Sequence, residues 1–175
     1  SLAHADAAAD YPAAALALDA QMVIRSSTGE RVVAARDFFV DLMTTALQSD
    51  EMLTAVRFPA RPARSGAAYV KLRQQASGFA IAGAATVVAL DESGRVSHAR
   101  VAITGVNGVP YRALAVEANL LGNAPTVEAM AAAATHAADG IEPLSDIHGS
   151  AEYRRDMACV ITRRALLKSL ERIGG

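Results

Sequence analysis

Cysteine and tryptophan are nearly absent from this sequence, which has one cysteine, Cys159, and no tryptophan. A single cysteine excludes an internal disulfide and any zinc or iron–sulfur site built from cysteines. It also favours a reducing compartment, so we predict a cytoplasmic location. Aromatic residues make up only 5% of the chain whereas alanine is abundant, which predicts closely packed helices and thin core layers.

Net charge and long apolar runs are also lacking. The formal net charge is -1, with acidic and basic residues interspersed, so there is no electrostatic footprint for nucleic acid or an anionic membrane surface. No apolar run approaches the roughly 20 residues that a membrane span requires. Residues 1–20 lack the basic start and the apolar stretch of a signal peptide. We therefore expect neither nucleic acid nor a membrane span.

The motifs of common catalytic and metal sites are missing as well. The histidines are far apart in the sequence, and none has the spacing of a zinc-binding HExxH motif. No G-x-S-x-G nucleophile elbow occurs. Residues 105–108 match neither G-x-G-x-x-G nor a Walker loop, so a simple turn is the favoured interpretation. We predict no catalytic residue and no metal site in this chain.

The residues that are present predict two units, of which the first is 1–59. Here Asp10 occupies the position of a helix N-cap, and Pro12 lies in the first turn, where a missing N–H group is tolerated. β-prone runs around a glycine-bearing turn predict a hairpin, and a further strand ends at Pro59. The expected elements are a helix at 12–18, hairpin strands at 21–25 and 30–33, a short helix at 36–43 and a strand at 50–58.

The second unit, 67–175, follows a linker at 60–66 that contains proline, glycine and arginine. Three β-prone runs separated by turns predict a three-stranded antiparallel meander with a helical cover. Thr126 and Ser150 have N-cap positions in front of two of the helices. The expected elements are strands at 68–73, 81–90 and 96–106 and helices at 111–121, 126–138 and 150–173. The predicted fold class is α+β.

The last predicted helix changes its apolar face along its length. In its first half the apolar side chains include Met157 and Ile161, and in its second half Leu166 and Leu170. The favoured interpretation is a helix that wraps its own core, and the alternative is a second packing partner such as another subunit.

Two charged residues allow both a structural and a functional interpretation. Asp10 has a complete structural explanation as a helix cap. Lys71 follows Tyr69 and Val70 in a β-prone run, so its ammonium group must find a partner or water, as an ordinary lysine on a strand surface does. The residues alone identify no active site.

Several short motifs resemble the flavoprotein (medium) subunits of the molybdenum hydroxylases, the family of carbon-monoxide dehydrogenase and xanthine dehydrogenase. Each motif is weak alone, but their joint order and spacing are specific and cover essentially the whole chain. The motifs that carry the likeness are 1–12, 36–39, 50–59, 69–73, 78–83 and 151–158.

The resemblance implies a fold and a cofactor. The fold is the C-terminal part of a second FAD-binding subdomain, followed by a three-stranded antiparallel sheet with three helices. In the family, FAD lies between this subdomain and an N-terminal half that carries its own glycine-rich loop. The resemblance thus implies a C-terminal fragment that lacks this half and a Thr-Ile-Gly-Gly before Ser1, and we expect it to retain little FAD alone.

The resemblance also implies partners. Substrate is oxidised at a molybdopterin centre in a large subunit, and electrons cross two [2Fe–2S] clusters in a small subunit to reach the FAD. The FAD passes them to an external acceptor, and the implied assembly is a dimer of heterotrimers. Neither the substrate nor the acceptor follows from this sequence.

Four residues match cofactor-binding positions of the family. Ser1 matches the end of the pyrophosphate loop, where backbone N–H groups meet phosphate oxygens. Asp10 matches an aspartate that accepts hydrogen bonds from hydroxyls beside the flavin. Leu53 matches a strand residue lying against the isoalloxazine, and Lys71 matches a lysine near the ring, where a cation would favour negative charge on the reduced flavin.

Two positions depart from the family pattern. Ala7 replaces a usual proline, which should loosen the first loop. Gly78 stands where many members have an acidic residue near the flavin, which changes the local charge. The competing hypothesis is a non-enzymatic α+β interaction module in which Asp10 and Lys71 are purely structural, and a Thr-Ile-Gly-Gly preceding Ser1 would favour the flavoprotein.

Overall fold

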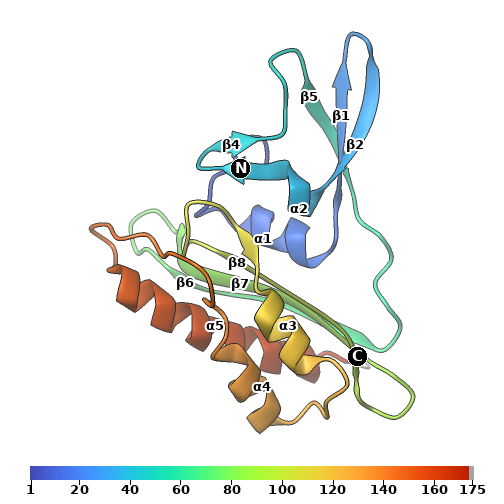
Figure 1. Cartoon of the computed structure of the whole chain (residues 1–175), viewed down its shortest axis with the longest axis vertical. Coiled ribbons are helices and arrows are strands. Elements are labelled where there is room, and N and C mark those ends of the chain that lie inside the picture. The colour runs from blue at the N-terminus through green and yellow to red at the C-terminus, as the bar shows by residue number, and fades with distance from the viewer. Residues whose placement is uncertain (174–175) are drawn as a thin grey trace.

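The computed structural model describes residues 1–173, which form two sheets, a small hairpin and five helices within that range. The predicted α+β class is confirmed, and Figure 1 shows the upper sheet above a larger sheet that helices flank. None of the described helices is long and apolar enough to cross a membrane.

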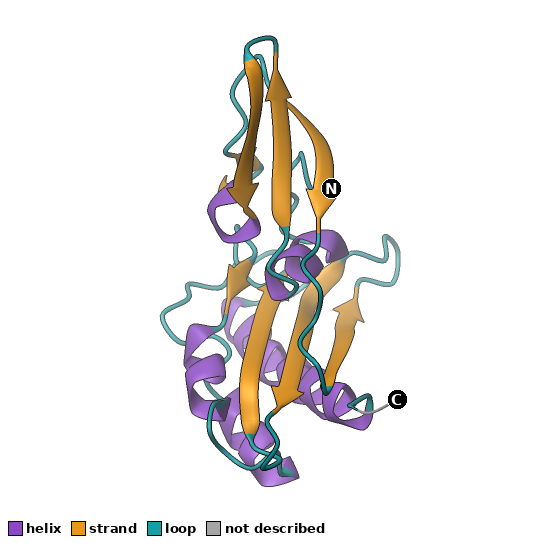
Figure 2. Ribbon diagram, turned by 90° about the vertical axis from the view of Figure 1, so that its right-hand side faces the viewer, coloured by secondary structure: helices purple, strands orange, loops and turns teal. Residues whose placement is uncertain are grey.

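The upper sheet and its neighbours come from the first third of the chain. The predicted hairpin is confirmed, and its strand β1 also pairs with β5, which gives the antiparallel order β2-β1-β5. Figure 2 shows these three strands rising above the rest of the molecule. The elements are α1 (Asp10–Ala17), β1 (Gln21–Ser26), β2 (Gly29–Ala34), α2 (Ala35–Phe38), β3 (Phe39–Asp41), β4 (Thr44–Thr45) and β5 (Met52–Arg57).

The short helix predicted at 36–43 is wrong in its second half. α2 ends at Phe38, and the chain then forms the β3–β4 hairpin. Phe38 and Phe39 are buried, whereas Leu42 and Met43 are 58% and 57% exposed at the hairpin turn. Met43 has a φ of +51°, which a helix does not allow, so the helical spacing of these apolar residues was coincidental.

The larger sheet has the antiparallel order β6-β7-β8-β9. The predicted meander supplies its first three strands, and the fourth is a two-residue strand whose Tyr111 pairs with Ile103. Tyr111 therefore does not begin a helix, which starts at Leu114 instead. The elements are β6 (Ser65–Arg73), β7 (Ala80–Leu90), β8 (Val96–Thr104), β9 (Tyr111–Arg112), α3 (Leu114–Leu120), α4 (Val127–Ala134) and α5 (Ala151–Glu171).

Helices cover the larger sheet on both faces. α5 packs on β6 and β7 with α3 and α4 beside it, while α1 packs on β7 and β8 from the opposite side. The α1 residues that face the sheet are mostly alanines, among them Ala13 and Ala17, so this layer is thin. β6 begins at Ser65, inside the range predicted as linker. The division into 1–59 and 67–175 stays a prediction.

The N-caps predicted for the last two helices are confirmed. Thr126 Oγ1 accepts a hydrogen bond from the Ala129 amide at 3.1 Å, and Ser150 Oγ accepts one from the Tyr153 amide at 3.2 Å. α4 ends at Ala134, earlier than the expected 138, because the chain continues in turns.

α5 buries one continuous stripe, so its apparent change of face has a simple explanation. The stripe includes polar members such as Thr162 and Ser169, and the Ser169 hydroxyl is hydrogen-bonded to that of Thr86 at 2.7 Å. Leu166 and Leu170 pack against the same core as Ile161. The favoured interpretation, a helix on its own core, is confirmed, because the apolar pattern omits the buried polar residues.

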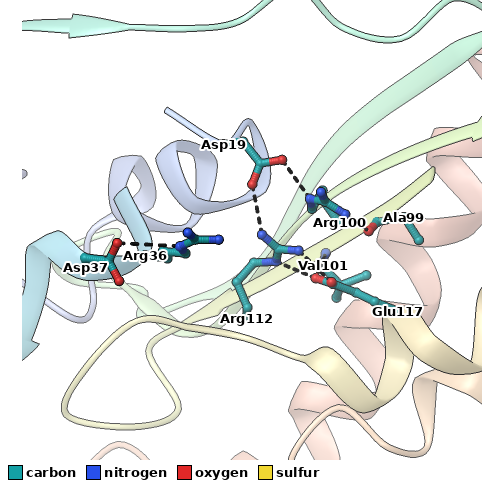
Figure 3. A network of polar contacts seen from close by, with 8 residues as sticks. All are labelled: Asp19, Arg36, Asp37, Ala99, Arg100, Val101, Arg112 and Glu117. Atoms are coloured by element: carbon teal, nitrogen blue, oxygen red, sulfur yellow. Dashed lines mark hydrogen bonds and ion pairs between the residues drawn. The ribbon is translucent and has the colours of Figure 1, made fainter. Parts of the chain in front are cut away.

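An ionic network joins the end of α1 to the larger sheet and α3 (Figure 3). The Asp19 carboxylate accepts hydrogen bonds from Arg100 Nε at 2.7 Å and from Arg112 Nη1 at 3.0 Å. Arg112 also forms a two-point ion pair with Glu117. The Glu117 carboxylate in addition accepts a hydrogen bond from the Val101 amide at 2.9 Å. The network therefore fixes α1 against the sheet.

Neutralising Asp19 should weaken this attachment. We expect Asp19→Asn to lower the free energy of unfolding by about 0.5–1 kcal/mol, since the carboxylate is partly exposed, and the loss should vanish at about 1 M salt. Asparagine tolerates the left-handed backbone at this position, where φ is +48°. Chemical denaturation measures the effect, and Asp37→Asn is the control, because the Arg36–Asp37 pair of Figure 3 is far more exposed. Equal losses in both variants would contradict the prediction.

Candidate functional site

The segment that leads into α1 is tied to the larger sheet through its backbone. The Ala8 carbonyl accepts a hydrogen bond from the Ala80 amide at 3.0 Å, and the Ala7 carbonyl accepts one from the Gly105 amide at 2.6 Å. The Thr104 hydroxyl donates to the Ala9 carbonyl at 2.9 Å. These bonds connect residues 7–9 to the start of β7 and the end of β8, and they place the first turn of α1 beside β6.

Asp10 is not the N-cap of α1, so that prediction is wrong. Ala9 has the N-cap position and makes no side-chain cap hydrogen bond, and Asp10 is the first helical residue. Its carboxylate binds side chains of β6 instead of backbone N–H groups of its own helix. The sequence pattern of a cap cannot distinguish these two uses of a carboxylate, because both place it at the helix start.

Lys71 and Tyr69 hold the Asp10 carboxylate. The two residues are separated by one position on β6, so their side chains point to the same face of the strand. Lys71 Nζ lies 2.9 Å from Asp10 Oδ1 and 2.7 Å from Oδ2, and the Tyr69 hydroxyl donates to Oδ1 at 2.6 Å. The lysine and aspartate side chains are 25% and 41% exposed, so the pair lies at an open edge of the core.

Lys71 also binds the loop between β6 and β7. Its ammonium donates to the Gly78 carbonyl at 2.8 Å in addition to the two aspartate oxygens. An ammonium has three N–H donors, so protein acceptors occupy all of them. Lys71 thus presents a neutralised ion pair to its surroundings, and it links the start of α1 to the loop at 74–79.

Tyr69 fits here because the neighbouring strand has a glycine. A Cβ added at Gly83 would lie 2.5 Å from the Tyr69 hydroxyl oxygen, so any larger residue would push the ring away. Burial and the neighbouring Asp10 carboxylate raise the pKa of Tyr69 above its ordinary value. The hydroxyl therefore stays protonated and serves as a hydrogen-bond donor to Asp10.

A pocket of about 340 Å³ opens beside this cluster. It lies between the start of the chain, the first turn of α1 and the loop that precedes β7. Its lining residues are Ser1, Ala9, Asp10, Tyr11, Lys71, Ser77, Gly78 and Phe79. The structure brings together three of the residues selected from the sequence, and it adds the aromatic ring of Phe79, which is 44% exposed.

Two family models match the chain. The model described as the CO dehydrogenase flavoprotein C-terminal domain matches residues 67–169, which is more than half of the sequence. The chain belongs to this flavoprotein family. A second model, described as the FAD binding domain in molybdopterin dehydrogenase, matches residues 1–61 and names the cofactor that the sequence predicts.

Relatives and solved structures of the flavoprotein family agree with this assignment. The 6-hydroxypseudooxynicotine dehydrogenase complex subunit alpha of Paenarthrobacter nicotinovorans is 37% identical over 98% of this chain and 58% of its own length. The carbon monoxide dehydrogenase structure from Hydrogenophaga pseudoflava, which lacks the Mo-pyranopterin moiety, matches with a TM-score of 0.92 and 40% identity. That match covers 98% of this chain and 60% of the other.

A second solved structure extends the comparison beyond carbon monoxide dehydrogenase. Quinoline 2-oxidoreductase from Pseudomonas putida 86 matches with a TM-score of 0.88 and 36% identity, over 98% of this chain and 59% of that one. The chain thus spans about three fifths of the length of the flavoprotein-family proteins it matches. The resemblance to the medium subunits stated from the sequence is confirmed.

Leu53 lies apart from the other predicted flavin-binding residues. It is in β5, paired in register with Ile24 of β1, and it packs against the core that surrounds α1. Among the described residues 1–173, it is not part of the lining of the pocket at Asp10 and Lys71. Its role beside a flavin stays a prediction.

Tyr69 and Phe79 are two residues of this candidate site that the sequence did not single out. In the sequence, Tyr69 has the position of a partly buried strand residue. Only the structure shows that its hydroxyl donates a hydrogen bond to Asp10. Phe79 follows Gly78 at the end of a loop, and the available signal is an aromatic residue inside the motif 78–83 that resembles the flavoprotein family. Within residues 1–173 the structure has no cluster of metal-ligating side chains.

Proposed function

We propose that this chain forms part of the FAD-binding medium subunit of a molybdenum hydroxylase. The observation that carries the proposal is the Tyr69–Asp10–Lys71 cluster beside the pocket, which joins the segment matched by the FAD-binding model to the segment matched by the flavoprotein C-terminal model. Bound FAD would supply a redox centre that receives electrons from iron–sulfur clusters and passes them to an external acceptor.

The residues at the pocket fit part of an FAD molecule. The Asp10 carboxylate can accept a hydrogen bond from a ribityl or ribose hydroxyl, and the Phe79 ring offers an apolar surface for a flavin ring. Ser1 is among the lining residues, and the family's pyrophosphate loop would lie next to it. About 340 Å³ is too small for the whole dinucleotide, so the remaining two fifths of the relatives' length would supply the other contacts.

The contacts of Lys71 refine its proposed role. A lysine whose donors are all occupied, and whose charge Asp10 balances, acts first as a link between α1 and the loop at 74–79. Its field at the flavin is that of an ion pair and is weaker than that of a free cation. We infer that it holds the Asp10 carboxylate and the Gly78 carbonyl at the pocket edge.

The partners belong to the same proposal. We propose a large subunit with the molybdopterin centre and a small subunit with two [2Fe–2S] clusters, assembled as a dimer of heterotrimers in the cytoplasm. Several relatives carry names of medium chains or subunits of such enzymes, which supports multi-subunit assembly.

Removing Lys71 should weaken FAD binding. In the full-length subunit, Lys71→Ala should lower FAD affinity about tenfold, because Asp10 and the loop at 74–79 lose a charge-assisted hydrogen-bond partner. Titration of the FAD-free protein with FAD, followed by flavin fluorescence, measures the change, and the visible absorption of the bound flavin should shift. The control is Lys168→Ala, an exposed lysine on α5. Unchanged affinity and spectrum would remove Lys71 from the flavin site.

The length of chain required for FAD retention is a second test. We expect the full-length subunit to purify with FAD and the segment 1–175 to retain little of it, because the pocket contacts only part of the cofactor. Absorbance of the purified proteins gives the ratio of flavin to protein. A stoichiometric yellow preparation of 1–175 would contradict the expectation, and a full-length subunit that binds no FAD would contradict the proposed function itself.

A further inference from the structure

We propose that Tyr69 is a positioning residue of the flavin site, acting through Asp10. It occupies one oxygen of the Asp10 carboxylate and thereby leaves the other oxygen as the acceptor for a hydroxyl group of the ligand. The inference rests on the proposed function, and it concerns a residue that does not line the pocket.

The hydrogen bonds of the carboxylate distinguish its two oxygens. A carboxylate oxygen accepts about two hydrogen bonds. Oδ1 receives two, from the Tyr69 hydroxyl at 2.6 Å and from Lys71 at 2.9 Å, whereas Oδ2 receives one, from Lys71 at 2.7 Å. The acceptor capacity that remains is therefore on Oδ2. Because Asp10 lines the pocket and is 41% exposed, a ligand in the pocket can reach it.

The surroundings of Tyr69 make its hydroxyl a fixed donor. The ring packs against the core on the α1 side of the sheet, and the hydroxyl oxygen sits over Gly83. The end of the ring lies close to the β7 backbone, since an ideal Cβ at Gly83 would be 3.2 Å from the ring carbon that carries the hydroxyl. The hydroxyl thus holds the carboxylate at Oδ1, while Lys71 holds both oxygens and the Gly78 carbonyl of the loop at 74–79.

This arrangement has a consequence for ligand choice. A carboxylate with one free acceptor position binds a hydrogen-bond donor, and an ionised phosphate group offers only acceptors. The pocket beside Asp10 should therefore take a polyol portion of the ligand and not a phosphate. Without the Tyr69 hydroxyl, the carboxylate could rotate and offer either oxygen, and the ligand hydroxyl would lose its fixed partner.

The test is Tyr69→Phe in the full-length subunit, which keeps the ring and removes only the hydroxyl. We expect FAD affinity to fall about tenfold, as for the loss of a hydrogen bond to a charged group, and the visible circular dichroism of bound flavin to change in the same sense as in Asp10→Asn. The control is Tyr111→Phe, which removes a partly buried hydroxyl bonded to the Ala137 carbonyl and outside the pocket lining. This variant should bind FAD as the unmodified protein does.

A double-mutant cycle separates positioning from a general structural effect. If Tyr69 acts through Asp10, Tyr69→Phe should have no further effect on FAD affinity in an Asp10→Ala background. Additive losses, or full affinity in Tyr69→Phe while the unmodified subunit binds FAD, would overturn the inference and leave the proposed function intact. Failure of the unmodified full-length subunit to bind FAD would overturn the proposed function, and the inference with it.

Discussion

Gly66→Ala should destabilise the protein by about 3 kcal/mol, because the added methyl group has no space. Gly66 lies in β6 where the strand passes directly under the last turns of α5. An ideal Cβ at this position would fall far inside van der Waals contact with the Ser169 carbonyl oxygen, and at 3.1 Å from the carbonyl carbon of Arg172. These are backbone atoms, so no side-chain rotation relieves the clash, and α5 would have to move away from the sheet.

Thermal or chemical unfolding of the purified variant measures the Gly66 effect. Gly108→Ala is the matched control, because a Cβ there approaches nothing closer than the Leu42 side chain at 3.7 Å. We expect that variant to lose less than about 1 kcal/mol. Equal stability of the two variants would show that α5 does not pack on β6 as closely as described.

Arg154→Met should be similarly destabilising, by about 3 kcal/mol, because it removes a buried guanidinium that binds a carboxylate and two backbone carbonyls. The Arg154 side chain is only 3% exposed and binds both Asp146 oxygens at 2.7 Å. It also donates to the carbonyls of Ile81 at 2.7 Å and Gly105 at 2.5 Å. The substitution takes this donor away from all of these acceptors and removes the side-chain link between the loop before α5 and the sheet.

The pH dependence of stability provides a second measurement on Arg154. Hydrogen bonding from the Arg154 guanidinium holds the pKa of Asp146 below its ordinary value. The contribution of the pair is therefore present at neutral pH and is lost as pH falls below the ordinary carboxyl range. Arg154→Met should lose this part of the acid sensitivity, whereas Arg155→Met, an exposed neighbour on α5, should retain it. An unchanged acid profile in Arg154→Met would contradict the assignment.

Regular elements were predictable from local patterns in this chain. The hairpin of β1 and β2, the meander and the caps at Thr126 and Ser150 follow from alternation, turn residues and hydroxyl side chains. β9 was not predictable, because two residues have no measurable alternation and their pairing depends on where β8 already lies. The turn at Met43 was missed for a related reason, since a methionine with positive φ has no sequence signature.

The candidate site was likewise predictable from the sequence only in part. The resemblance pointed to Ser1, Asp10 and Lys71, and these residues do line one pocket. What the sequence could not predict is their mutual contact, because Asp10 and Lys71 are far apart in the chain and each has an adequate local explanation. The role of Tyr69 could not be predicted for the same reason, since its hydroxyl gains a partner only when the first turn of α1 lies beside β6.

The packing of α1 has a consequence for how the chain folds during synthesis. Its apolar side is buried mainly against β7 and β8, which leave the ribosome much later than α1 does. Such non-local contacts slow folding and leave the early segment exposed in the meantime. Because that side consists largely of alanine, α1 exposes little apolar area before β7 and β8 are synthesised, and it is a poor nucleus for aggregation. The thin alanine layer on this face of the sheet therefore lowers the risk of aggregation during synthesis, in addition to packing against the sheet in the folded protein.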